Sequence, residues 1–150
     1  MHMSYLRFAA MISTSTVVMY GAMYLNSYAL EHVMWSETRA WMALIMGSIM
    51  TIVMLLFMLK MYTVRSVNIV ILLSSAVLFA VALWVVRSQV TIDDTDYMKA
   101  MIPHHSIAIM TSERAQINDP RVRQLADEII KAQRREIAEM KQLIDDLERN

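Results

Sequence analysis

Methionine and histidine side chains in the C-terminal third of the chain have the types and spacing of a soft metal site. Met98, Met101 and His105 recur at helical spacing and so share one face of a helix, with His104 at the edge of that face. Thioether sulfur is a soft, neutral ligand that suits Cu(I) and Ag(I), and imidazole binds Cu(I), Cu(II) and Zn(II). The alternative is a packed helical core, because methionine is also a common core filler.

A turn signal predicts where this helix ends and where the next one begins. In Asn118-Asp119-Pro120, the aspartate suits an N-cap and the proline suits the first helical position. The earlier helix should run to about Ile117, and Pro103 should either kink it or begin a new helix. After the turn, apolar residues recur at helical spacing to the end of the chain: Val122, Leu125, Ile129, Ile137, Met140, Ile144 and Leu147. Residues 95–150 are thus predicted to form an antiparallel helical hairpin.

The hairpin brings residues of its second helix beside the methionine and histidine face. Counted from the turn, three pairs are expected to face each other: His105 with Gln133, Met101 with Glu136, and Met98 with Met140. A carboxylate or amide beside an imidazole orients that imidazole. The spacing therefore predicts thioethers and imidazoles gathered in one place, with Gln133 and Glu136 as their supporting polar groups.

The same region resembles a known family. The residues that carry the resemblance are Met101-Ile102-Pro103-His104-His105, Ala108-Ile109-Met110, Asp119-Pro120, Gln133, Glu136-Ile137 and Met140. They look like the signature of the domain-of-unknown-function 305 family, which includes CopM-like periplasmic copper-binding proteins. The resemblance covers about Thr95–Asn150 and implies an α-helical domain of ferritin-like shape that handles copper or silver. It carries over to these positions: Met101, His104, His105, Met110, Gln133, Glu136 and Met140.

One departure from the family pattern predicts self-association. Soluble members usually contain two such hairpins, whereas this chain contains one. A single hairpin is a poor core by itself, so we expect a homo-oligomer that completes a four-helix bundle. Membrane-anchored members of the family also exist, which fits the rest of the chain.

Three uncharged segments precede the hairpin, and each is long enough to cross a bilayer. They run over residues 8–30, 40–59 and 66–86, and roughly 20 helical residues suffice for a span. The first is too long for the apolar part of a signal peptide and ends in a poor cleavage site, so it is interpreted as a retained span. The predicted fold is all-α: a three-span region over residues 1–87, a linker over 88–94, and the hairpin over 95–150.

Basic residues in the short loops predict the orientation. Arg7, Lys60 and Arg65 lie on one side, against Arg39 and Arg87 on the other, where acidic residues also gather. The positive-inside rule then places the N-terminus in the cytoplasm and the hairpin outside, which in a bacterial inner membrane means the periplasm.

Two further groups of residues are auxiliary metal candidates. A stripe of methionines at a spacing of four follows the second segment: Met42, Met46, Met50, Met54 and Met58. It is either a ladder for Cu(I) or, as we favour, flexible apolar packing. In the first loop, His32 and Met34 could pass metal to the hairpin, although a solvated histidine beside an interfacial Trp35 is the favoured interpretation. Met1-His2-Met3 could bind Cu(II), but a flexible start is an equal alternative.

Composition excludes several classes of protein. The formal net charge is zero, which argues against a nucleic-acid binder, and the absence of cysteine removes disulfides, thiolate zinc sites and cysteine nucleophiles. No Glu-x-x-His pair, hydrolase serine motif or zinc-protease motif occurs, so no enzyme is expected. We expect a membrane-anchored Cu(I) or Ag(I) binder for metal tolerance, storage or delivery, with a copper-handling membrane protein as a further partner. The alternative is a structural or assembly subunit that uses the hairpin as a protein-interaction module.

Overall fold

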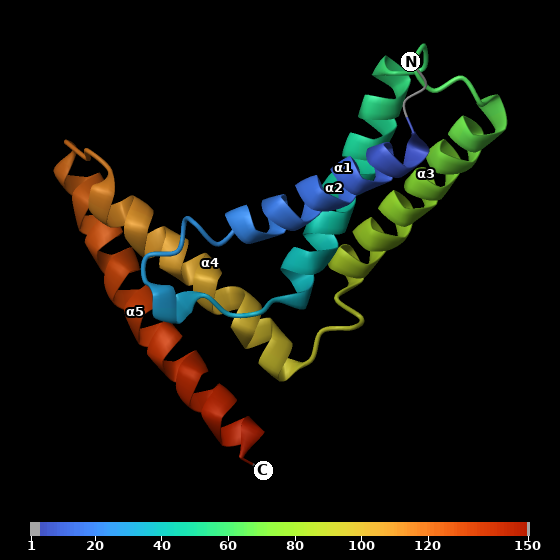
Figure 1. Cartoon of the computed structure of the whole chain (residues 1–150). Helices are drawn as coiled ribbons and strands as arrows, with labels where there is room; N and C mark the ends of the chain where they lie inside the picture. Colours follow the sequence, from blue (N-terminus) through green and yellow to red (C-terminus); the bar gives the residue numbers. More distant parts are fainter. Residues whose placement is uncertain (1–3, 150) are drawn as a thin grey trace. The chain divides into compact units, whose positions relative to one another are not determined.

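The computed structural model describes residues 4–149, which form five α-helices and one short 3-10 helix without any strand (Figure 1). The Met1-His2-Met3 candidate lies outside the described residues. The chain divides into two compact units. The first contains the residues up to Met23 together with Thr38–Thr91, and the second contains Tyr24–Glu37 together with the residues from Ile92 onward.

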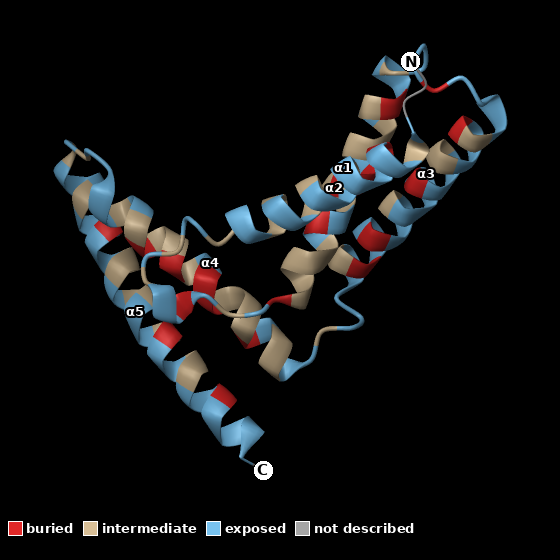
Figure 2. Cartoon of the chain, viewed as in Figure 1, coloured by how far each residue is buried: buried red, intermediate tan, exposed pale blue. Residues whose placement is uncertain are grey.

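Three helices make up the first unit: α1 (Tyr5–Ala22), α2 (Glu37–Phe57) and α3 (Arg65–Ser88). In the described part of the chain, α2 and α3 are the helices that are long and apolar enough to cross a membrane. Much of the surface of α3 is exposed and apolar, including Val70, Leu73 and Val77 (Figure 2). Such a surface is what lipid would cover.

The prediction of a first span over residues 8–30 is wrong, so two candidate spans remain rather than three. Helix α1 ends at Ala22, and the residues from Tyr24 to Glu37 belong to the second unit. Within α1, the run Ser13-Thr14-Ser15-Thr16 lowers its apolar character. The hydroxyl of Thr16 donates a hydrogen bond to the carbonyl of Ile12 at 2.9 Å, so this polar group is satisfied inside the helix. Counting charges alone missed these hydroxyl groups.

Aromatic packing and one buried amide hold α1 against the connection between α2 and α3 and the first turn of α3. The ring of Tyr62 lies 5.0 Å from that of Tyr5 and 5.2 Å from that of Phe8, between centroids. The hydroxyl of Tyr5 lies 2.8 Å from Oδ1 of the buried Asn68, whose amide nitrogen donates to the carbonyl of Tyr62 at 2.7 Å. The buried amide is therefore satisfied on both sides, as burial of a polar group requires.

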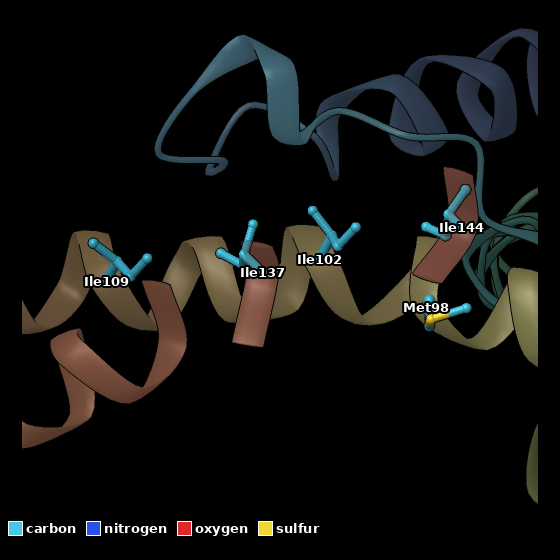
Figure 3. Packing of buried hydrophobic residues seen from close by; sticks show 5 residues of the cluster. All are labelled: Met98, Ile102, Ile109, Ile137 and Ile144. Carbon is cyan, nitrogen blue, oxygen red and sulfur yellow. The ribbon is translucent and has the colours of Figure 1, made fainter. Parts of the chain in front are cut away.

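The second unit contains the predicted hairpin, formed by α4 (Asp94–Arg114) and α5 (Pro120–Glu148). The predicted turn is confirmed, because the Asp119 side chain accepts a hydrogen bond from the backbone N–H of Arg121 at 2.8 Å. Helix α4 ends three residues before the expected Ile117, and it runs without interruption through the buried Pro103. The helices bury a core between them: Met98, Ile102, Ile109, Ile137 and Ile144 (Figure 3).

Residues 24–37, here called the strap, add a third layer to the hairpin. The strap contains the 3-10 helix Leu30–His32. The backbone N–H of Tyr28 donates to Oγ of Ser106 at 2.7 Å, and Nδ1 of His32 lies 2.9 Å from the same oxygen. Met34 packs against the hairpin core. His32 is 7% exposed, so the interpretation of a solvated histidine is wrong.

We predict that Ser106→Ala destabilises the second unit by about 1–3 kcal/mol, because the Tyr28 N–H and the His32 ring nitrogen would lose their buried partner. The measurement is the free energy of unfolding, or the midpoint of thermal unfolding, of the full chain in detergent. The control is Ser74→Ala, whose hydroxyl bonds within α3 and is exposed. Equal effects of the two substitutions would contradict the role of the Ser106 hydroxyl.

A second prediction concerns Gly47 in α2. A Cβ atom at this position would lie 2.5 Å from Oγ1 of Thr16 on α1, so the two helices approach closely here. Gly47→Ala should lower the thermal midpoint, because overpacking typically costs about 1–3 kcal/mol. Gly21→Ala is the matched control, since a Cβ there meets no atom within 4 Å. A Gly47→Ala variant as stable as Gly21→Ala would contradict tight packing between Gly47 and Thr16.

Candidate metal-binding groove

A groove of about 640 Å³ runs along one face of the hairpin. Helix α4 contributes one wall and α5 the other. The lining residues are Asp94, Tyr97, Met98, Met101 and His105 from α4, with Glu136, Glu139, Met140, Leu143, Asp146 and Leu147 from α5. The groove therefore brings together three thioethers, one imidazole and one carboxylate that the sequence singled out.

The helical repeat explains why these side chains share a groove. Met98, Met101 and His105 lie on successive turns of one face of α4, as their spacing predicts. Glu136 and Met140 lie one turn apart on α5. Met140 also packs against the core cluster that contains Met98.

The pairing of His105 differs from the expectation. Its Nδ1 atom lies 3.2 Å from Oε2 of Glu136, one helical turn beyond the expected Gln133. The expectation assumed a tight turn at residues 118–119, whereas the connection between the helices begins at Ala115. Burial of the core isoleucines aligns the two helices, and counting residues from a turn does not include that constraint. Gln133 does not line the groove.

Burial sets the protonation of His105. It lowers the pKa of the imidazole from its ordinary value of 6.5; the Glu136 carboxylate opposes this shift and His104 adds to it. A neutral imidazole, which is the form that binds metal, is therefore favoured near neutral pH. The Nδ1 atom is buried and close to Glu136, yet it makes no well-directed hydrogen bond with any group in the described part of the chain. The ring thus retains an unused polar atom inside the protein.

The remaining candidates of the hairpin lie outside the groove. His104 is exposed, with its ring centroid 6.2 Å from that of His105. Met110 is half-buried further along α4 and does not line the groove. The set implied by the family resemblance is therefore divided: Met101, His105, Glu136 and Met140 come together, whereas His104, Met110 and Gln133 do not join them.

His32 and Met34 of the strap contact the hairpin but not the groove. Because Ser106 Oγ accepts from Tyr28, its own proton is available to His32 Nδ1, and Nε2 then faces Oε1 of Glu31 at 3.4 Å. Burial and Lys141 lower the pKa of His32, against the opposing effect of Glu31. His32, Glu31 and Lys141 line a smaller pocket of about 300 Å³. A transfer of metal from the strap stays a prediction.

Hard ligands alone do not form a metal site here. Among residues 4–149, no three His, Asp or Glu side chains are grouped so as to hold a metal ion. The groove also offers the three thioethers, which are donors that suit soft ions.

Part of the methionine stripe of α2 packs against other side chains. Met42 is exposed, whereas Met54 and Met58 pack against the cluster of Phe8, Leu55 and Tyr62. The structure therefore provides the packing that the sequence favoured for the end of the stripe. Conduction of Cu(I) along it stays a prediction.

The sequence interpretation placed Leu147 in the apolar stripe but missed Tyr97 and Leu143, with which it forms the apolar end of the groove. The signal was present, because Leu143 and Leu147 continue the helical spacing of Glu136 and Met140. Leu143 and Leu147 are 46% and 48% exposed, so the apolar end of the groove is open to solvent.

Comparisons with known proteins agree with the resemblance over the hairpin. Residues 87–149 match the family described as "Domain of unknown function (DUF305)". A curated relative, "Uncharacterized protein L153" of Acanthamoeba polyphaga mimivirus, is 39% identical over 77 residues, which cover 50% of this chain and 51% of the relative. The chain thus spans about half the length of the curated relative that it matches. No solved structure matches. These findings support the assignment of the hairpin region, residues 87–149, to the domain-of-unknown-function 305 family.

Proposed function

We propose that this protein is membrane-anchored and binds Cu(I) or Ag(I) in the groove of the hairpin, for metal tolerance, storage or delivery. The observation that supports this proposal is the convergence of Met98, Met101, Met140 and His105 on one groove. Their donor atoms are soft or intermediate and neutral, which suits a soft monovalent cation better than Zn(II) or Mg(II). Cu(II) is a weaker candidate, because only one imidazole lines the groove.

Glu136 has a supporting role in this proposal. A site of thioethers and one imidazole carries no charge, so a bound monovalent cation would leave one positive charge in a partly apolar groove. The carboxylate of Glu136, 3.2 Å from His105 Nδ1, can compensate that charge and orient the ring. Burial of a charge is tolerated when an opposite charge lies beside it.

The location of the protein is part of the same proposal. Helices α2 and α3 are long and apolar enough to cross a membrane, which supports a membrane anchor. The location that we propose for it is a bacterial inner membrane. With two spans, the strap and the hairpin would lie on one side of the membrane, and the connection between α2 and α3, which holds Lys60, would lie on the other. The positive-inside rule favours a cytoplasmic connection. The hairpin would then face the periplasm, where a copper-handling membrane protein could deliver or receive the ion. No catalytic step is part of the proposal.

A second candidate function is a structural or assembly subunit whose hairpin binds another protein. The exposed apolar end of the groove favours it, because uncovered leucines often mark an interaction surface. A metal-binding measurement distinguishes the two functions. A metal-binding protein would bind Cu(I) through His105 and the thioethers, whereas an assembly subunit would not need to bind metal at all.

We expect one Cu(I) ion per chain to bind tightly in an anaerobic titration of the purified full-length protein against a competing chelator. The double variant Met101→Leu/His105→Gln should lose this binding, because it removes two donors while it keeps side-chain volume. The matched control is Met110→Leu/His104→Gln, which changes the same residue types outside the groove. Equal losses in both variants, or no binding by the unmodified protein, would sink the groove site.

Glu136→Gln should lower the affinity for Cu(I) by about 10–100-fold without changing the stoichiometry, as for other groups that support a ligating histidine. Glu139→Gln is the control, since this carboxylate also lines the groove but forms no ion pair with His105 in the described part of the chain. The same competition titration measures both. If the two variants behave alike, Glu136 does not act through His105.

A further inference from the structure

Helix α5 carries a second apolar stripe beside the one that packs on α4. Its members are Val122, Leu125, Ile129, Met140, Leu143 and Leu147. At 3.6 residues per turn they fall within an arc of about 60°. The neighbouring arc holds the buried residues Ala126, Ile137 and Ile144. Val122 and Leu125 are 49% and 56% exposed, so the stripe stays uncovered at both ends of the helix.

The charges of α5 are divided between its two halves. Residues 120–135 contain five basic and two acidic side chains, whereas residues 136–149 contain five acidic and two basic ones. The groove lies in the acidic half, and its lining includes Asp94, Glu139 and Asp146 but no lysine or arginine. The surface that would cover the groove should therefore be apolar and basic.

We propose that a second copy of this chain covers the stripe, with the two α5 helices antiparallel. In this arrangement the basic half of each helix lies over the acidic groove of the other, and Val122 and Leu125 meet the apolar end of the partner's groove. A parallel arrangement would place each half against a half of like charge. Surface charges contribute little affinity individually. They select the orientation, and burial of the leucines provides the attraction.

The interface also includes residues that the metal proposal does not use. Leu125, Arg121 and Arg135 lie outside the groove lining, so the pairing would stand even if the groove bound no metal. If both proposals hold, the partner helix forms a cover over the groove. The pairing also makes the interface self-complementary, as a two-fold dimer requires.

Cross-linking of single cysteines tests the orientation, because the chain has no cysteine of its own. Leu125 and Leu143 lie at equal distances from the midpoint of Pro120–Glu148, so they should be opposite each other in the antiparallel pair. Differently tagged Leu125→Cys and Leu143→Cys full-length chains are co-expressed, and their membranes are treated with a short bismaleimide under metal chelation. We expect the mixed 125–143 product to exceed both same-residue products at least tenfold.

Gln124→Cys with Gln142→Cys is the control pair, since both positions are exposed and lie on α5 away from the stripe. It should give little product. Arg121→Glu/Arg135→Glu should reduce the mixed product at least tenfold, and adding Glu139→Lys/Asp146→Lys to the same chain should restore it. Same-residue products in excess would overturn the antiparallel pairing. Absence of product above the control would overturn self-association through this stripe and leave the stripe to a different protein.

Discussion

The second unit depends on the burial of one hydroxyl group, that of Ser106, between α4 and the strap. Two helices alone bury a single line of side chains, which is too little for a stable domain. The strap adds apolar contact through Met34, and the Ser106 hydroxyl satisfies the backbone of Tyr28 and the ring of His32 at the same point. Since Ser106 directly follows His105, the hydroxyl also fixes the turn of helix that carries the imidazole of the groove.

The groove lies on the face of the hairpin that the strap leaves open. One face of α4 carries Ser106 and receives the strap, while Met98, Met101 and His105 line the groove. The two sets of residues alternate along one helix. The helical repeat directs the residue that contacts the strap to one face and the candidate metal ligands to another. The same division applies to α5, where Ile137 and Ile144 are buried and Met140 and Leu143 line the groove.

The hairpin could be predicted because its turn depends on local sequence signals. The features that depend on contacts between distant residues could not be predicted. The N-cap at Asp119 and the proline after it depend on neighbouring residues, so the sequence located the turn correctly. The methionines and His105 share a face because of the helical repeat alone. The partner of His105 depends on core packing, and counting from the turn placed it one turn away. The strap could not be predicted, because its contacts with Ser106 join residues 74 and 78 positions apart.

The position of the strap in the chain has a consequence for the order of folding. The strap leaves the ribosome well before α4 and α5 are synthesised, so its polar groups cannot find Ser106 until the chain is nearly complete. The second unit consists of two segments that are not adjacent in the sequence. A fragment that begins at α4 would lack the strap and with it Tyr28 and His32, the partners of Ser106. Closure of this long loop costs entropy that only the finished hairpin can offset. The strap and the hairpin are separated in the sequence by α2 and α3, and they must come together to complete the second unit.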